Sequence, residues 1–224
     1  GDPAAGGGGG GGAPPPAGPD PFITGQAAGP IDSYKWSVGG EIGVLGNLGM
    51  GESPAGDRLY GPGGANLRLF ANFIINEEQR LGVQGYLGFA GLPPTDENEF
   101  DQGLAMADIG GALFMHRPLT GHIYWTPLIG AHLAIQQPQE LSQGFLAIGA
   151  RAEVGFSYVF GPQGEHALSI NPGLNLYFPA GGEIDGVDPD EYGFDRTRGT
   201  FAINAGYTFR FSTPFGSTPL ITLE

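Results

Sequence analysis

Residues 145–160, FLAIGARAEVGFSYVF, alternate between apolar side chains and small or polar ones along their whole length. The even-numbered positions are all apolar, whereas the odd-numbered positions from 147 to 157 carry small residues, Arg151 and Glu153. Successive side chains of a β-strand point to opposite faces, so this period of two predicts a strand with one apolar face and one polar face. Residues 200–211, TFAINAGYTFRF, repeat the pattern and predict a second such strand.

The same period of two runs through most of the chain, and helical periodicity is absent. Each segment has about ten residues or more, the length that a tilted strand needs to cross a bilayer. The eight predicted strands are Tyr34–Leu45, Asn66–Ile75, Arg80–Ala90, Leu104–His116, His122–Ile135, Phe145–Phe160, His166–Phe178 and Thr200–Phe211.

The connections between these strands alternate in length. Turns of 4 or 5 residues alternate with loops of 20, 13, 9 and 21 residues. Tight turns on one rim, long loops on the other and an even strand number are typical of transmembrane barrels. The sequence therefore predicts an all-β fold, an eight-stranded antiparallel up-and-down transmembrane β-barrel. A soluble sandwich or extracellular barrel also alternates, but its water-facing side would not need so many glycines.

The composition excludes several classes of protein. Charged residues make up only 14% of the chain, too few to cover a water-facing surface generously, and the net charge of −14 argues against binding nucleic acid. The absence of cysteine rules out disulfides, thiolate metal sites and cysteine nucleophiles. No apolar run is long enough for a transmembrane helix.

Three regions differ in composition. Residues 1–31 hold 11 Gly and 7 Pro, which cannot bury enough surface to offset their ordering entropy, so they predict a disordered or extended Gly/Pro-rich arm. Residues 32–211 form the predicted barrel. Residues 212–224 form a short C-terminal tail.

The last strand carries a short pattern: Asn204, Gly206 two residues later, then aromatic residues at Phe209 and Phe211. This resembles the terminal-strand signal by which bacterial outer-membrane barrels are recognised for assembly. Together with the strand count, it makes the chain similar to the small eight-stranded outer-membrane barrels. The chain departs from that family by continuing beyond its terminal aromatic, Phe211.

The resemblance implies a location and partners. The barrel would lie in the bacterial outer membrane, with long loops extracellular and both termini periplasmic. Its partners would be outer-membrane lipid, the barrel-assembly machinery, and periplasmic or membrane proteins bound through residues 1–31.

The face assignments place eleven titratable side chains in the lumen: Lys35, Glu41, Arg68, Arg80, Asp108, His116, His122, His132, Arg151, Glu153 and Arg210. Unpaired ions in such an interior are costly, so these charges must pair. Counting along the strands puts five of them at similar height, which predicts an ion-pair plug of Glu41, Arg68, Asp108, Arg151 and Glu153. A gated pore or a proton path is the alternative use of these charges.

Catalysis finds little support. The four histidines show no HxH or HExxH spacing, which argues against a metal triad. Some small outer-membrane barrels modify lipids with a His and a Ser on their lipid-facing or outer rim, but Ser37, Ser157 and Ser169 fall on lumen positions here. The sequence therefore predicts a protein without enzymatic activity.

The long loops hold thirteen of the 23 acids: Glu52, Asp57, Asp96, Glu97, Glu99, Asp101, Glu140, Glu183, Asp185, Asp188, Asp190, Glu191 and Asp195. In the last loop Asp185, Asp188, Asp190 and Glu191 space their oxygens around a glycine, a composition that could wrap calcium. The alternatives are a solvated acidic loop, or one that divalent ions bridge to anionic glycolipid. No other cofactor is predicted.

Two function classes follow. One is a structural or scaffold subunit of an envelope assembly, in which residues 1–31 reach partners. The alternative is a stand-alone surface-interaction or adhesion-type barrel that binds ligands or cations through its acidic loops. A narrow gated pore and a lipid-modifying enzyme are weaker readings of the same barrel.

Overall fold

The structure is a computed structural model that describes residues 34–52, 56, 58–96, 103–162, 164–181 and 186–211. The predicted arm (1–31) and tail (212–224) lie outside the described residues. Its elements are β1 (Trp36–Leu48), β2 (Gly63–Asn76), β3 (Leu81–Leu92), β4 (Leu104–Met115), β5 (Arg117–Pro118), β6 (Ile123–Pro138), β7 (Phe145–Phe160), β8 (His166–Pro179), the 3₁₀ helix η1 (Pro189–Tyr192) and β9 (Arg198–Phe211).

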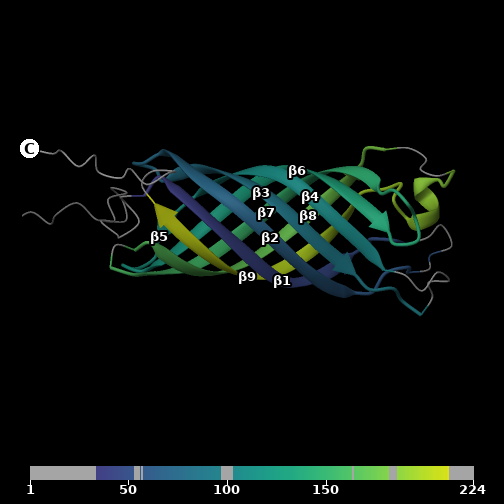
Figure 1. Cartoon of the computed structure of the whole chain (residues 1–224), viewed down its shortest axis with the longest axis horizontal. Coiled ribbons are helices and arrows are strands. Elements are labelled where there is room, and N and C mark those ends of the chain that lie inside the picture. Colours follow the sequence, from purple (N-terminus) through teal and green to yellow (C-terminus); the bar gives the residue numbers. More distant parts are fainter. Residues whose placement is uncertain are drawn as a thin grey trace, which may run out of the picture.

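The strands form a closed antiparallel barrel (Figure 1). Each long strand pairs with the next along the chain, β4 pairs with β6, and β9 closes the sheet against β1. The two-residue β5 only adds a short bridge to β6, so the wall consists of eight long strands. The predicted eight-stranded up-and-down barrel is confirmed.

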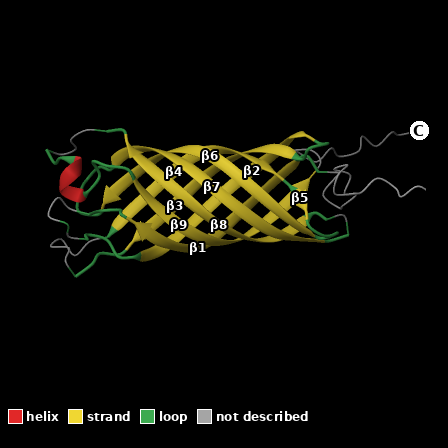
Figure 2. Cartoon of the chain, turned by 180° about the vertical axis from the view of Figure 1, so that it is seen from behind, coloured by secondary structure: helices red, strands yellow, loops and turns green. Residues whose placement is uncertain are grey.

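The two rims differ as the connection lengths predict. Figure 1 shows the long connections and η1 at one end and the short turns at the other, and Figure 2 shows the same arrangement from behind. The start of β1 and the end of β9 lie at the short-turn rim, where Trp36 pairs with Phe211. No helix in the described ranges is long and apolar enough to cross a bilayer.

The outer wall is apolar. Outward-facing aliphatic and aromatic side chains are exposed on every long strand, among them Ile42, Leu69, Leu87, Ile109, Ile129, Ile148, Val154, Leu168 and Ile203. A surface of this kind is unfavourable in water and fits the hydrocarbon of a bilayer.

Aromatic side chains gather on the outside near the short-turn rim. Trp36 and Phe73 lie with ring centroids 4.5 Å apart, and Phe209 and Phe211 stack at 6.2 Å. Phe178, by contrast, is exposed near the long-loop end of β8. Aromatic residues in these places are those that anchor a barrel at the interfaces of a membrane.

Two of the predicted lumen residues lie elsewhere. Lys35 is exposed and pairs with Glu77, with Nζ 2.7 Å from Oε1. His122 is exposed and its ring lies 6.0 Å from that of Tyr158. Both residues precede the strands β1 and β6, and the alternation of side chains no longer determines their direction outside the barrel wall.

Candidate functional site

The middle of the lumen holds four charged side chains in mutual contact, which we call the ion-pair layer: Glu41, Arg68, Arg151 and Glu153. Arg68 pairs with Glu41 and, at 3.3 Å, with Glu153. Arg151 pairs with Glu153 and, at 3.4 Å, with Glu41. All four side chains are at most 7% exposed. Two cations and two anions thus neutralise each other inside the barrel, as buried charges require.

Amides from three further strands complete this layer. Asn171 donates from Nδ2 to Glu41 Oε2 at 2.8 Å, and Asn204 donates to Glu41 Oε1 at 3.2 Å. Gln84 accepts from Arg151 Nη1 at 3.2 Å. The hydrogen bonds join strands on opposite sides of the lumen, so the layer braces the barrel across its width.

Asp108, the fifth residue of the predicted plug, lies apart from the ion-pair layer. Its Oδ1 is buried and accepts no hydrogen bond within the described part of the chain. Cross-strand pairing links Glu41, Arg68, Gly88 and Asp108 in one row.

The pairing register explains that separation. The row that starts at Glu41, in the middle of β1, continues through Asp108, Ala134 and Ala147 to Pro179, the last residue of β8. Strands in a barrel are tilted, so such a row climbs around the wall. Asp108 therefore lies closer to the long loops than residue counting along the strands indicates.

Glycines make room for the long lumen side chains. A Cβ atom on Gly88 would collide with the carboxylate of Asp108, and one on Gly149 would collide with the imidazole of His132. Similarly, a Cβ on Gly110 would come within 2.6 Å of the Tyr86 hydroxyl. The lumen glycines thus accept the polar side chains of neighbouring strands, which fills a narrow interior at high density.

The long-loop half of the lumen is filled by apolar side chains, which we call the loop plug. The plug combines buried wall residues with side chains from the loops. Its members are Leu45, Met50, Leu59, Tyr60, Leu92, Leu104, Met106, Ala134, Phe145, Ala147, Tyr177, Tyr192, Phe194 and Ala202. The aromatic rings of Phe145 and Phe194 stand 5.2 Å apart, so the last loop packs directly on the wall.

Arg198 fastens that loop to the barrel. Its guanidinium donates to the carbonyl oxygens of Gly193 and Phe194, and to Gln136 Oε1 at 3.3 Å. It also lies 4.3 Å from the centroid of the Phe194 ring. Arg198 precedes the predicted strand Thr200–Phe211 and belongs to β9 in the structure, where only 3% of it is exposed.

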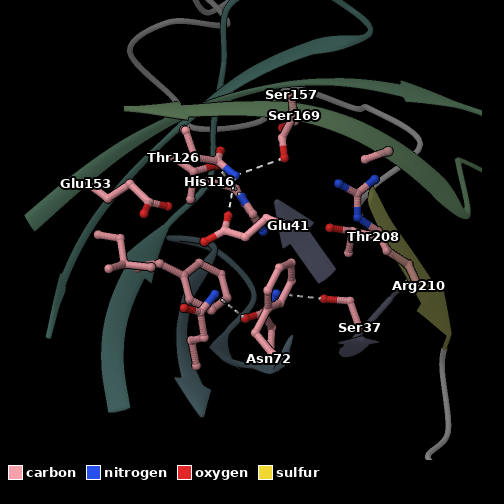
Figure 3. A pocket seen from close by; sticks show the side chains of 17 residues that line it. Ser37, Glu41, Asn72, His116, Thr126, Glu153, Ser157, Ser169, Thr208 and Arg210 are labelled. Carbon is pink, nitrogen blue, oxygen red and sulfur yellow. Dashed lines mark hydrogen bonds between the residues drawn. The ribbon is translucent and has the colours of Figure 1, made fainter. Parts of the chain in front are cut away.

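A polar cavity of about 60 Å³, which we call the chamber, lies between the ion-pair layer and the short-turn rim (Figure 3). Glu41 and Glu153 line it, as do His116 and Arg210 nearer to the short-turn rim. Hydroxyl and amide groups cover much of the remaining wall: Ser37, Asn72, Gln84, Thr126, Ser157, Ser169, Asn171 and Thr208. A cavity of this size and polarity has room for a few water molecules.

Arg210 and Arg80 narrow the short-turn end of the lumen. Both are buried; Arg210 donates to the Gly164 carbonyl at 3.2 Å, and Arg80 lies 5.7 Å from the Tyr124 ring. His116 and Thr126 share a hydrogen bond, with Nδ1 of the histidine 2.8 Å from Oγ1 of the threonine. The serines at positions 37, 157 and 169 are all lumen residues that line the chamber.

The residues of the terminal-strand pattern lie on the seam that closes the barrel. Asn204, Gly206, Phe209 and Phe211 of β9 stand opposite residues 43, 41, 38 and 36 of β1. The asparagine and the glycine face the lumen, while the two phenylalanines are on the outside. That these residues act as an assembly signal remains a prediction.

Three of the four predicted calcium ligands are described, and Asp185 lies outside the described residues. Asp188, Asp190 and Glu191 are exposed on and beside η1. Within the described ranges, no three His, Asp or Glu side chains are grouped as metal ligands. Calcium binding by these acids stays a prediction.

Comparisons with known proteins bear on the fold. No family model and no curated protein matches the sequence. Among solved structures, Neisserial surface protein A (NspA) has a TM-score of 0.51 at 14% identity, over 79% of this chain and 97% of its own. OprG from Pseudomonas aeruginosa has a TM-score of 0.49 at 10% identity, over 82% and 100% of the two chains. Ail of Yersinia pestis has a TM-score of 0.39 at 15% identity, over 78% of this chain and 99% of its own.

At such identities a likeness concerns the fold alone. The NspA structure agrees with the closed sheet and the apolar outer wall of this chain. The chain therefore has the fold of a small eight-stranded antiparallel β-barrel, the fold that NspA shares.

Proposed function

We propose that this chain is a non-conducting integral barrel of the bacterial outer membrane that serves, without enzymatic activity, as a structural subunit of an envelope assembly. In this proposal the long loops face the outside of the cell, and the short-turn rim faces the periplasm. The exposed apolar wall supports the membrane location, since it would be unfavourable against water.

The observation that carries the proposal is the filling of the lumen. The loop plug and the ion-pair layer follow one another along the barrel, and both consist of buried side chains. The chamber has room for only a few waters. A solute could pass only if the ion pairs separated and the loop plug moved. In this proposal the protein therefore acts by binding other molecules at its rims.

The short-turn rim is the rim that suits a scaffold. Both β1 and β9 meet there, at Trp36 and Phe211, so residues 1–31 and 212–224 are attached to the same end of the barrel. As a random coil, a segment of about 30 residues would span about 30 Å, enough to reach a neighbouring protein. Its most apolar part, Phe22 and Ile23, is the proposed anchor.

Two measurements test this proposal. Purified protein in planar bilayers should show no steady channel current, and large stable currents would contradict the closed lumen. Purification from membranes in mild detergent should recover a partner protein with the full chain. The partner should be lost when residues 1–30 are deleted, while the truncated barrel keeps its folding and heat resistance. If the truncated protein fails to fold, the arm is part of the barrel and the scaffold role loses its support.

One observation favours the second candidate, a surface-interaction barrel. A hollow of about 390 Å³ opens among the long loops, with Asn47, Glu52, Arg58, Thr95 and Asp96 in its wall. A polar hollow of this size could hold part of an extracellular ligand, and NspA is itself named a surface protein. Binding of whole cells or matrix components that persists after deletion of residues 1–30 would favour this candidate over the scaffold.

A further inference from the structure

Arg210 is a buried cation on the wall of the chamber. The residue is 6% exposed, and its Nη1 donates to the Gly164 carbonyl at 3.2 Å. Within the part of the chain that the structure describes, no ion pair includes Arg210. Glu165, whose backbone carbonyl accepts from the Arg210 amide, has its carboxylate Oε1 3.7 Å from Nε2 of His166. A guanidinium buried without a counter-charge is unfavourable, so this charge calls for an anionic partner.

The two carboxylates that line the same chamber are already balanced. Glu41 and Glu153 each pair with both arginines of the ion-pair layer, which is neutral as a unit. They also lie at a distance from Arg210. Gly206, which stands opposite Glu41, is four residues before Arg210 on β9, or about 13 Å along the strand. The ion-pair layer therefore leaves the charge of Arg210 uncompensated.

A directed chain of hydrogen bonds runs from the ion-pair layer toward Arg210. Arg151 donates from Nη1 to Gln84 Oε1 at 3.2 Å, and Gln84 Nε2 donates to Asn72 Oδ1 at 3.0 Å. Asn72 Nδ2 donates in turn to Ser37 Oγ at 3.0 Å. Because a guanidinium can only donate, Arg151 fixes the direction of every bond in this chain. The chain therefore ends at a serine that has accepted a hydrogen bond and has its own proton left to donate.

Ser37 stands directly opposite Arg210. The two residues are a cross-strand pair of β1 and β9, and both line the chamber. Ser37 donates to none of the described residues, and the guanidinium of Arg210 has N–H donors alone. Thr208, two residues earlier on the same face of β9, adds a second hydroxyl to the chamber wall (Figure 3). Donors from two strands thus face a polar space where they need an acceptor.

We propose that Arg210, Ser37 and Thr208 bind a small monovalent inorganic anion of the chloride class in the chamber. Arg210 supplies the positive charge and charge-assisted hydrogen bonds, and the two hydroxyl groups supply neutral donors. A volume of about 60 Å³, room for a few water molecules, admits a halide ion but not a lipid headgroup. The site does not depend on the scaffold role proposed above, and deletion of residues 1–30 leaves all three residues in place.

The anion has a route to the chamber from the short-turn rim. A second cavity, of about 20 Å³, shares Ser37, Asn72, His116 and Arg210 with the chamber and is lined by the exposed Lys35 as well. The ion-pair layer and the loop plug fill the lumen on the other side. An ion would therefore enter and leave through one rim, so binding requires no opening of the lumen.

The width of the ³⁵Cl⁻ magnetic resonance line tests the proposal, because a chloride ion that exchanges with a protein site relaxes faster than a free ion. The full chain in an uncharged detergent should broaden the line, and bromide should compete. Arg210→Gln should weaken binding about tenfold or more, since it removes a charged donor, and Ser37→Ala should weaken it less. Arg196→Gln, the matched control, removes an arginine whose side chain is 51% exposed and should keep the broadening.

Heat stability is the second readout. At equal ionic strength, chloride should raise the unfolding temperature of the wild type above its value in gluconate, an anion too large for the chamber. Chloride should not do so for Arg210→Gln. Gel mobility shows whether each variant is folded.

Several results would overturn the proposal. One is the absence of line broadening by the folded wild-type barrel, which would show that the chamber holds water alone. Another is equal broadening by Arg210→Gln, and a third is loss of broadening in Arg196→Gln, which would move the site to the long loops. If Arg210→Gln does not fold, Ser37→Ala decides the question, because it keeps every charge of the chain. Undiminished broadening by Ser37→Ala would then contradict the site.

Discussion

Replacing Arg151 by alanine should destabilise the barrel more than any removal of a surface charge. Arg151 pairs with Glu153 and Glu41, and its side chain is 2% exposed. The variant leaves two buried carboxylates with Arg68 alone, so the ion-pair layer changes from neutral to a charge of −1.

The distance between Arg151 and its partners determines the expected loss of folding stability. At an effective dielectric constant of about 20, two unit charges 3.4 Å apart, as Arg151 and Glu41 are, attract each other by about 5 kcal/mol. Hydration of the free guanidinium in the unfolded chain offsets part of this, which leaves the loss of about 3 to 5 kcal/mol that is usual for a broken buried pair. The exposed pair of Lys35 and Glu77 is the control, and Lys35→Ala should cost only about 0.2 to 1 kcal/mol.

Urea unfolding of the protein in lipid vesicles, followed by tryptophan fluorescence and by gel mobility, measures both losses. The double variant Arg151→Ala/Glu153→Gln restores neutrality between Glu41 and Arg68, so it should be more stable than Arg151→Ala alone. A loss for Arg151→Ala no larger than that for Lys35→Ala would refute the reasoning, because the ion-pair layer would then add nothing to stability. Channel recordings on the same variant show whether the weakened layer also leaks.

Three other outcomes follow from the structure. Val154→Arg on the outer wall should cost about 2 to 4 kcal/mol of folding stability in lipid, whereas Ile75→Arg at the rim should cost at most about 1; equal costs would contradict the membrane belt. Gly88→Ala should destabilise β3 by about 1 to 3 kcal/mol, while Gly85→Ala, with no atom near its Cβ, should be tolerated in a urea titration. Burial and the charge of Glu140 raise the pKa of Tyr192 to about 12, so the loops should lose stability as the pH rises from 10 to 12. The difference in ultraviolet absorbance between the wild type and Tyr192→Phe reports the ionisation of this phenol, which should occur well above pH 10. Ionisation near pH 10 would show that the loop is open and that Tyr192 is in water.

The sequence by itself determines the strands, their faces and the rims. Alternation in residues 145–160 and 200–211 decides which side chains meet lipid and which meet the lumen, because a strand has a period of two whatever its neighbours are. The same rule brings Glu41, Arg68, Arg151 and Glu153 into one interior. The period of two holds only within a strand. Lys35 precedes β1, and its side chain lies outside the lumen.

Depth in the lumen and the burial of loop residues are decided only by the tertiary structure. Asp108 is displaced from the ion-pair layer because the rows of paired residues climb around a tilted barrel, and no count within one strand contains that tilt. Tyr60, Tyr192 and Arg198 lie in loops or at the first residue of a strand, where no periodicity predicts a face. Their burial results from loops folding against one another over the barrel mouth, and contacts between segments so distant in the chain leave no local pattern in the sequence.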